Sequence, residues 1–211
     1  MRELSLVIGN KNYSSWSLRP WLAMRHLGLE FDEIIIPLDR PETAASIARH
    51  TPAGRVPVLI DRGLHVWESL AILEHLAERH PELWPKPIEQ RARARSLAAE
   101  MHAGFAALRS ALPMNLRASG RKVAIEAATA ADIHRIESIW SDAAGPFLFG
   151  PFGAVDAMFA PVATRFRTYG VPLEGTARAY AAALLDHPAM RRWQEEARAE
   201  SWSVAHEEVG L

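Results

Sequence analysis

Residues 51–69, TPAGRVPVLIDRGLHVWES, constrain the fold of this chain more than any other stretch. Residues 56–60 are apolar and rich in β-branched side chains, which favours a buried strand, and Pro57 has no N–H and so belongs at that strand's first residue. The sequence Asp61-Arg62-Gly63 supplies turn chemistry before a second short run at residues 64–67. The stretch therefore predicts a hairpin.

A helix follows this hairpin directly. Glu68 and Ser69 stand where helical spacing begins, at Leu70, Leu73 and Leu76. A helix start with free N–H groups and a hydroxyl can hold an anion, so this helix start is a candidate binding site.

The first 80 residues follow the order β-α-β-α-β-β-α. The earlier elements are predicted as a strand over 4–9, a helix that Gly28 stops, a strand over 31–37 and a short helix over 42–50. Pro20 is comfortable only in the first turn of a helix, which favours Ser17 as the N-cap. Two strands joined by a helix indicate a parallel pair.

The rest of the chain is helical in pattern after a proline-rich linker. Apolar spacing predicts helices over 88–111, 129–144, 155–169, 175–185 and 188–199. We therefore expect two domains, residues 1–81 and 88–211, with residues 82–87 as the linker.

Composition excludes several classes of function. Of 211 residues, 49% are hydrophobic and the formal net charge is -1, so nothing drives nonspecific nucleic-acid binding. There is no cysteine, which removes disulfides, thiolate metal sites and a cysteine nucleophile. No stretch approaches the length of a membrane span, and the start, MRELSLVIGN, has no signal-peptide pattern. We expect a cytoplasmic protein.

Three motifs resemble those of the soluble glutathione transferases. TPAGRVPVL is similar to the family's N-P-x-G-K-V-P-x-L, WESLAILEHLAERH to its x-E-S-x-A-I-x-x-Y-L, and HPAMRRW to its H-P-x-x-x-x-W. The resemblance implies the glutathione transferase fold: an α/β thioredoxin-like N-terminal domain and an all-α C-terminal domain. It also implies glutathione as co-substrate, no metal and a homodimer.

The resemblance implies a set of glutathione-binding residues. Val56, joined to Pro57 by a cis bond, would pair its backbone with the cysteinyl part of glutathione, and Glu68 and Ser69 would hold the γ-glutamyl end. The whole set is His50, Arg55, Val56, Pro57, Glu68 and Ser69. Arg55 and His50 would lie near the glycyl carboxylate.

The loop before the first helix holds the candidate catalytic hydroxyls. A glutathione thiol has a pKa of about 8.5 to 9, and a hydroxyl plus a helix N-terminus favour its anion. Serine-type members place this hydroxyl about five residues before an arginine, which gives Ser14, with Ser15 and Tyr13 as alternatives. The loop is loosely similar to the S-S-C-S-W element of the zeta class.

The second substrate should bind between the domains. The candidates are Trp16, Met101, His102, Phe105, Arg109 and Trp202. Arg109 or Arg117 could counter an acidic substrate. One departure concerns stability: the family often places a hydroxyl residue three positions before Asp156, where this chain has Gly153, so we expect a weaker helix cap.

The favoured function is glutathione conjugation to a small apolar electrophile. Without a cysteine, the bound glutathione thiolate itself must be the nucleophile. One alternative is a glutathione-dependent cis–trans isomerase of a conjugated diacid. A second alternative is a noncatalytic binding protein with the same fold. The sequence does not identify the electrophile.

Overall fold

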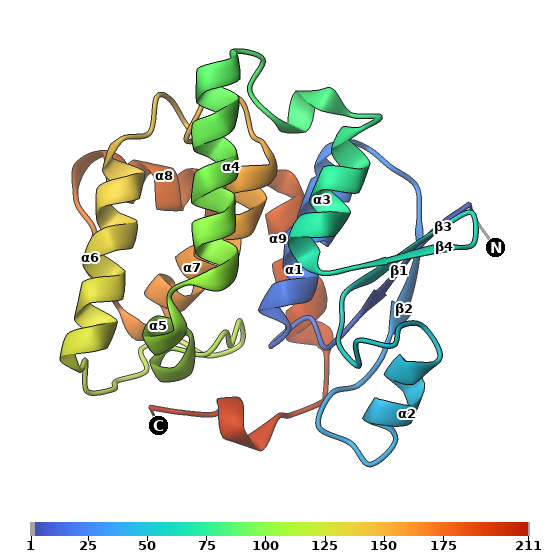
Figure 1. The fold of residues 1–211 in the computed structure, drawn as a ribbon. Helices are drawn as coiled ribbons and strands as arrows, with labels where there is room; N and C mark the ends of the chain where they lie inside the picture. Colours follow the sequence, from blue (N-terminus) through green and yellow to red (C-terminus); the bar gives the residue numbers. More distant parts are fainter. Residues whose placement is uncertain (1–2, 211) are drawn as a thin grey trace.

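The computed structural model describes residues 3–210 and contains a four-stranded sheet flanked by helices (Figure 1). The strands are β1 (Leu4–Ile8), β2 (Asp32–Ile35), β3 (Val58–Asp61) and β4 (Leu64–Trp67), in the spatial order β2-β1-β3-β4. Strands β1 and β2 are parallel, whereas β1 with β3 and β3 with β4 are antiparallel. The predicted parallel pair and hairpin are confirmed, although Pro57 precedes β3 rather than opening it.

Alternation along the strands gives the sheet two apolar faces. Leu6 and Leu59 lie in the core that α1 (Ser15–His26) and α3 (Ser69–Ala77) share. Their neighbours Val7 and Val58 pack instead with Ile47 of α2 (Thr43–Ala48). The sheet is therefore covered by α1 and α3 on one face and by α2 on the other.

Helix α1 begins earlier than the sequence indicates. Its first residue is Ser15 and its N-cap is Ser14, so the prediction of Ser17 as N-cap is wrong and Pro20 lies in the second turn. The Ser17 hydroxyl serves another partner, because its Oγ accepts the Gly9 N–H at 3.1 Å and lies 2.7 Å from Ser14 Oγ. Tertiary pairing with the end of β1 overrides the local preference of proline.

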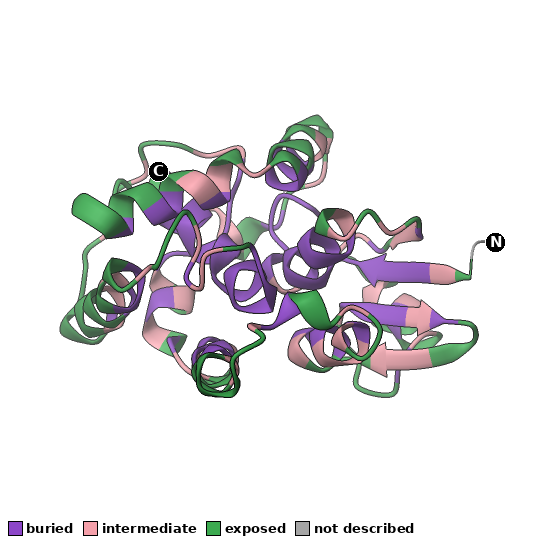
Figure 2. Ribbon diagram, turned by 90° about the horizontal axis from the view of Figure 1, so that it is seen from above, coloured by how far each residue is buried: buried purple, intermediate pink, exposed green. Residues whose placement is uncertain are grey.

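The second half of the chain is all helical. Its helices are α4 (Ile88–Ala103), α5 (Ala106–Ala111), α6 (Ala127–Ser141), α7 (Ala154–Tyr169), α8 (Gly175–Asp186) and α9 (Pro188–Ala199), with 3-10 turns at Pro81–Leu83 and Ala205–Glu207. Buried residues concentrate along the middle of the molecule (Figure 2), and α7, buried along nearly its whole length, packs against α1, α4 and α8. One apolar core therefore joins both halves. Across residues 3–210, no helix is long and apolar enough to cross a membrane.

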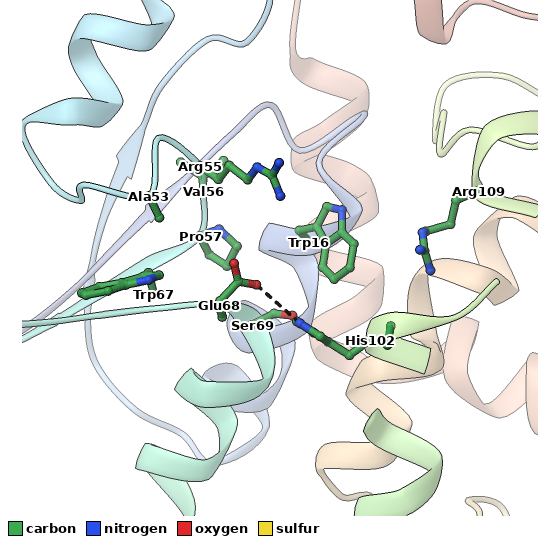
Figure 3. Close-up of a pocket in the computed structure, with 11 residues that line it drawn as sticks. Trp16, Ala53, Arg55, Val56, Pro57, Trp67, Glu68, Ser69, His102 and Arg109 are labelled. Atoms are coloured by element: carbon green, nitrogen blue, oxygen red, sulfur yellow. Dashed lines mark ion pairs between the residues drawn. The ribbon is translucent and has the colours of Figure 1, made fainter. Parts of the chain in front are cut away.

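The helix predicted over 88–111 is two helices. Gly104 ends α4, and Phe105 takes a left-handed φ of 58° before α5 begins. The Asp132 carboxylate of α6 accepts the N–H of Leu108 at 3.0 Å, so a side chain from a distant helix stabilises the new start. Arg109 of α5 lines the cleft, with its guanidinium 5.5 Å from the ring centroid of Trp16 (Figure 3).

The N-terminus of α7 is organised by the buried carboxylate of Asp156. Its Oδ2 accepts the Gly153 N–H at 2.8 Å, and its Oδ1 accepts the Leu148 N–H at 3.1 Å and the Tyr180 hydroxyl at 2.9 Å. The half of the cap that a hydroxyl at position 153 would supply is absent, and the Asp156 half is present with two further bonds. A Cβ on Gly153 would lie 2.8 Å from the carbonyl oxygen of Leu83, so no hydroxyl residue fits there without movement.

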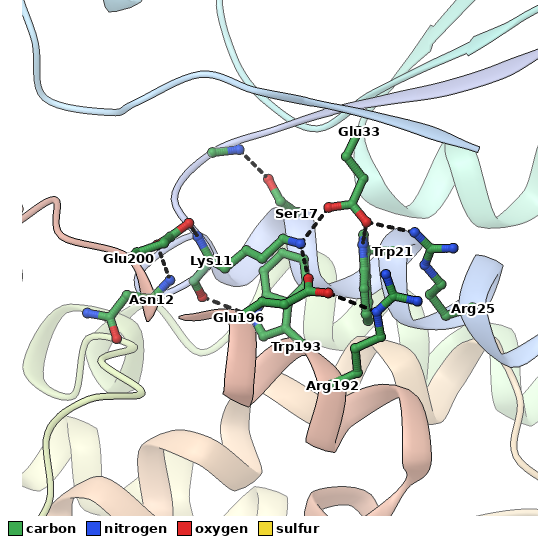
Figure 4. Close-up of polar contacts among 11 residues, drawn as sticks. Lys11, Asn12, Ser17, Trp21, Arg25, Glu33, Arg192, Trp193, Glu196 and Glu200 are labelled. Atoms are coloured by element: carbon green, nitrogen blue, oxygen red, sulfur yellow. Dashed lines mark hydrogen bonds and ion pairs between the residues drawn. The ribbon is translucent and has the colours of Figure 1, made fainter. Parts of the chain in front are cut away.

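The second domain holds the loop between β1 and α1 in place (Figure 4). The buried Lys11 ammonium donates to Glu33 of β2 and to Glu196 of α9. The Glu200 carboxylate, just after α9, accepts the N–H of Lys11 at 2.7 Å and of Asn12 at 3.0 Å. The loop that carries the candidate hydroxyls is therefore fixed by contacts from both domains.

Candidate functional site

A cleft between the two domains contains most of the candidate residues. It consists of two adjoining hollows of about 480 and 520 Å³ that share Trp16, Arg55, Val56 and Arg109. We call the first the α3 hollow, because Glu68 and Ser69 line it (Figure 3). We call the second the α1 hollow; it is lined by Ser14, Ser15, Arg165, His206 and Glu207.

A cis peptide bond lies in the wall of the α3 hollow. The bond between Val56 and Pro57 is cis, as the resemblance implied. Val56 lies two residues before β3, whose pairing starts at Val58, so its backbone stands outside the sheet ladder. Arg55 extends beside it at the rim of the cleft (Figure 3).

The start of α3 presents unpaired polar groups to this hollow. Glu68 is the N-cap, with a left-handed φ of 69°, and Ser69 is the first helical residue. Ser69 is only 1% exposed, yet its hydroxyl has no hydrogen-bond partner. A buried orphan hydroxyl beside free helix N–H groups is costly unless a ligand accepts from it.

The Glu68 carboxylate reaches across the domain boundary. Its Oε2 lies 3.5 Å from Nε2 of His102 on α4. Burial, followed by the charge of Arg19, lowers the pKa of His102, whereas Glu68 acts in the opposite direction. Because neutral His102 adds no positive charge, the Glu68 carboxylate remains available for an ammonium group.

Trp16 stands between three basic side chains in the middle of the cleft. The Arg19 guanidinium lies 4.1 Å from its ring centroid, the Arg109 guanidinium 5.5 Å, and the His102 ring 5.3 Å in an edge-on contact. Burial and the charges of Arg165 and Arg109 lower the pKa of Arg19 to about 9, which leaves it charged at neutral pH. The centre of the cleft is therefore aromatic and positively charged.

Three hydroxyl residues of the loop, Tyr13, Ser14 and Ser15, line the α1 hollow, and all three are buried. Ser14 Oγ donates to Ser17 Oγ at 2.7 Å, and Ser15 Oγ accepts a hydrogen bond from Arg165 Nη2 at 3.0 Å. The Tyr13 hydroxyl is held by other partners: it donates to Glu208 at 2.6 Å and accepts from Arg117 at 2.8 Å. The Tyr13 hydroxyl is thus held by two charged side chains, whereas Ser14 bonds to a neutral hydroxyl and only the oxygen of Ser15 is engaged.

Several predicted residues lie elsewhere. Met101 is 1% exposed and Phe105 is also buried; both pack into the core and line neither hollow. The carbonyl of His50 lies 2.6 Å from the His65 ring, and His50 lines neither hollow. Arg117 is committed to Tyr13 and to carbonyl oxygens that include that of Trp202, so it does not reach the cleft. For Met101 and Phe105 the cause is that helical spacing does not show which buried face meets the cleft.

The structure adds residues that the sequence analysis missed. They are Arg19, Trp67, Arg165, His206 and Glu207. Arg19 and Arg165 sit in ordinary helical patterns, and only their complete burial sets them apart. His206 and Glu207 come from the segment after α9, whose path the sequence does not show.

Comparisons with known proteins agree with this architecture. Residues 13–79 match the family model of the glutathione S-transferase N-terminal domain. The chain is 33% identical over 93 residues to a probable maleylacetoacetate isomerase of Caenorhabditis elegans, covering 43% of this chain and 42% of that protein. It is 28% identical over 141 residues to glutathione S-transferase T1 of Arabidopsis thaliana, covering 58% and 56%. The matches thus span about half the length of these relatives.

Solved structures match over nearly the whole chain. A glutathione transferase homologue from Burkholderia, solved with bound glutathione, has a TM-score of 0.73 at 21% identity, covering 94% of this chain and all of that one. The theta class glutathione S-transferase of Xanthomonas axonopodis pv. citri has a TM-score of 0.67 at 23% identity, covering 91% and 97%.

The fold and the cleft define a class of protein. A thioredoxin-like domain with a cis proline, followed by an all-helical domain that closes a cleft over it, is the glutathione transferase fold. The family model of the glutathione S-transferase N-terminal domain matches residues 13–79, and the chain as a whole has the fold of the solved glutathione transferases.

Proposed function

We propose that this protein is a glutathione transferase that joins the glutathione thiolate to a small electrophile. The observation that carries the proposal is the buried, unpartnered Ser69 hydroxyl at the start of α3, next to the Glu68 carboxylate. An amino-acid end such as the γ-glutamyl group of glutathione complements both. Its carboxylate would accept from Ser69 and the helix N–H groups, and its ammonium would pair with Glu68.

The rest of the tripeptide would follow the α3 hollow. The backbone of Val56 would pair with the cysteinyl residue, and Arg55 would meet the glycyl carboxylate at the rim. This arrangement would direct the cysteinyl sulfur from Val56, which both hollows share, into the α1 hollow that Ser14 and Ser15 line. By family resemblance alone, we extend the proposal to a cytoplasmic homodimer.

The chemistry would depend on a stabilised thiolate. The thiol loses its proton to water, and a serine hydroxyl with the N-terminus of α1 stabilises the resulting anion. The sulfur lone pair then forms a bond to an electrophilic carbon, and the leaving group departs with its bonding electrons. Trp16 would provide an apolar surface for that electrophile.

The loop serines provide a direct test of this proposal. In the parent protein, the thiol pKa of bound glutathione should be about one to two units below that of free glutathione. Ser14→Ala or Ser15→Ala should reduce that shift. Ultraviolet thiolate absorbance against pH measures it. An unshifted thiol in the parent would contradict thiolate activation. Tight binding with no turnover of any electrophile would favour the noncatalytic alternative.

A second candidate, a glutathione-dependent isomerase of a conjugated diacid, is supported by Arg109. This arginine lines both hollows beside Trp16, and one relative carries the name of such an isomerase. In that reaction the thiolate adds to the double bond, the new single bond rotates, and the thiolate leaves again. The reaction requires a cation where the diacid's carboxylate lies.

Arg109→Gln distinguishes the two candidates. If an acid is the substrate, this change should lower kcat/KM for 4-chloro-3,5-dinitrobenzoate by about 10-fold while changing that for uncharged chlorodinitrobenzene by less than about 3-fold. Steady-state kinetics with the two aryl chlorides measures the ratio. Arg121→Gln is a matched control, because Arg121 pairs with Glu208. An equal loss of kcat/KM for both aryl chlorides would count against an acidic substrate.

A further inference from the structure

Arg165 is a buried cation with an unusual set of partners. It lies on α7, is 5% exposed and lines the α1 hollow. Its guanidinium donates to the carbonyl oxygens of Arg109, at 3.3 Å, and of Leu112, and to the hydroxyl oxygen of Ser15 at 3.0 Å. All three acceptors are neutral. A buried charge held only by neutral dipoles retains a strong field, which favours a negative charge nearby.

The contact with Arg165 fixes what the Ser15 hydroxyl can do. Its oxygen accepts from the guanidinium, so its own proton must point elsewhere. Ser15 is buried, lines the cleft and is the first residue of α1. A hydroxyl that accepts from a cation is also a stronger donor. Ser14 differs, because its hydroxyl partner is the neutral Ser17.

The charged groups around Arg165 leave the site positive. Arg109 from α5 and Arg19 from α1 add positive charge near Arg165. Glu207 from the C-terminal segment adds one negative charge, and the phenol of Tyr169 on α7, which also faces Arg165, is neutral. Burial lowers the pKa of Arg165 to about 10, with Glu207 acting in the opposite direction and Arg109 in the same one. Arg165 therefore stays protonated at neutral pH.

We propose that Arg165 is a positioning residue of the thiolate site, which aims the Ser15 hydroxyl at the glutathione sulfur and strengthens it as a donor. The proposal rests on the glutathione function proposed above. It assigns a part of the activating machinery to the second domain, since α7 supplies the cation and α1 supplies the hydroxyl. The thiol would be activated only where the two domains are packed together.

A double-mutant cycle on Arg165 and Ser15 tests the proposal. Arg165→Met should raise the pKa of bound glutathione by about one unit and lower kcat/KM below pH 7 about 10-fold, with the glutathione Kd within about 3-fold of the parent value. In the Ser15→Ala background, the same change should shift the thiol pKa by less than about 0.3 units. Thiolate absorbance and calorimetry provide the two readouts.

Two further variants control for structure. Arg167→Gln removes a cation from the same helix that instead donates to Gln194, so the thiol pKa should be unchanged. Arg165→Lys keeps the charge but replaces the planar guanidinium fork with a single ammonium group, and the pKa of the bound thiol should lie between the values for the parent and Arg165→Met. If Arg165→Met does not fold, as judged by circular dichroism, the lysine variant in both Ser15 backgrounds provides the cycle.

The outcomes separate the inference from the function on which it rests. An unchanged thiol pKa in folded Arg165→Met would overturn the inference. An equal shift in the Ser15→Ala background would also overturn it, because Arg165 would then act on the sulfur without the hydroxyl. A parent protein that does not bind glutathione would refute the proposed function itself.

Discussion

Asp156→Ala should lower the free energy of unfolding by about 3 kcal/mol at pH 7.5, because it leaves buried donors without an acceptor. The Asp156 carboxylate accepts the N–H groups of Gly153 and Leu148 and the hydroxyl of Tyr180, all in the core around α7. Each lost bond costs about 0.5 to 1.5 kcal/mol, and each stranded buried donor adds to that loss. Urea unfolding followed by circular dichroism measures the change.

Matched variants identify the source of that loss. Tyr180→Phe removes one of the three donors and should cost about 1 kcal/mol. Asp156→Asn retains one acceptor oxygen, so its loss of unfolding free energy should lie between those of Asp156→Ala and Tyr180→Phe. A cost for Asp156→Ala no larger than that for Tyr180→Phe would show that the backbone donors find other partners, which would contradict this account of the α7 cap.

The pH dependence of stability has a definite sign at this site. Burial raises the pKa of Asp156 to about 6, against the opposing effect of its hydrogen bonds. The folded state therefore binds the proton more tightly than the unfolded state, whose carboxyl titrates near 3.9. Relative to Asp156→Asn, the parent should gain stability as the pH falls from about 6 to about 4 and show no further change above 6.

Glu68→Gln should weaken glutathione binding by about 10- to 100-fold, because it removes the charge that we propose pairs with the γ-glutamyl ammonium. Glutamine has the size of glutamate and adopts the left-handed φ of 69° at about the same cost, so the stability of the free protein should change little. Isothermal titration calorimetry measures the dissociation constant.

Glu74→Gln is the matched control for this prediction. Glu74 lies on the same helix and pairs with Arg95 at the surface, away from the cleft. Glu74→Gln should leave the glutathione Kd within about 2-fold of the parent value, since surface ion pairs contribute little to stability or binding. An equal effect of the two variants would show that the net charge of α3, rather than a contact with Glu68, governs binding.

The elements with strong local patterns were predictable from sequence. The hairpin followed from β-branched runs around Asp61-Arg62-Gly63, and β4 was predicted with its observed bounds. The cis bond at Val56 came from the family motif and not from physical reasoning. The boundaries of α7 were placed within one residue, because an apolar face and the terminal Gly170 mark them.

What the sequence did not show depends on contacts between distant residues. The start of α1 moved because Ser17 bonds to Gly9, and α4 separated from α5 because Asp132 stabilises a new start. Arg165 could not be singled out, since a helical pattern shows burial but not the partner of a buried charge. The partners of Asp156 were hidden for the same reason.

We propose that the start of α3 binds the γ-glutamyl end of glutathione. Calorimetric titration with glutathione and with cysteinylglycine, which lacks that end, tests this claim most directly. We expect glutathione to bind at millimolar concentration or tighter, and cysteinylglycine to bind at least about 10-fold more weakly. Equal binding of the two peptides, or no binding of glutathione at millimolar concentration, would contradict it.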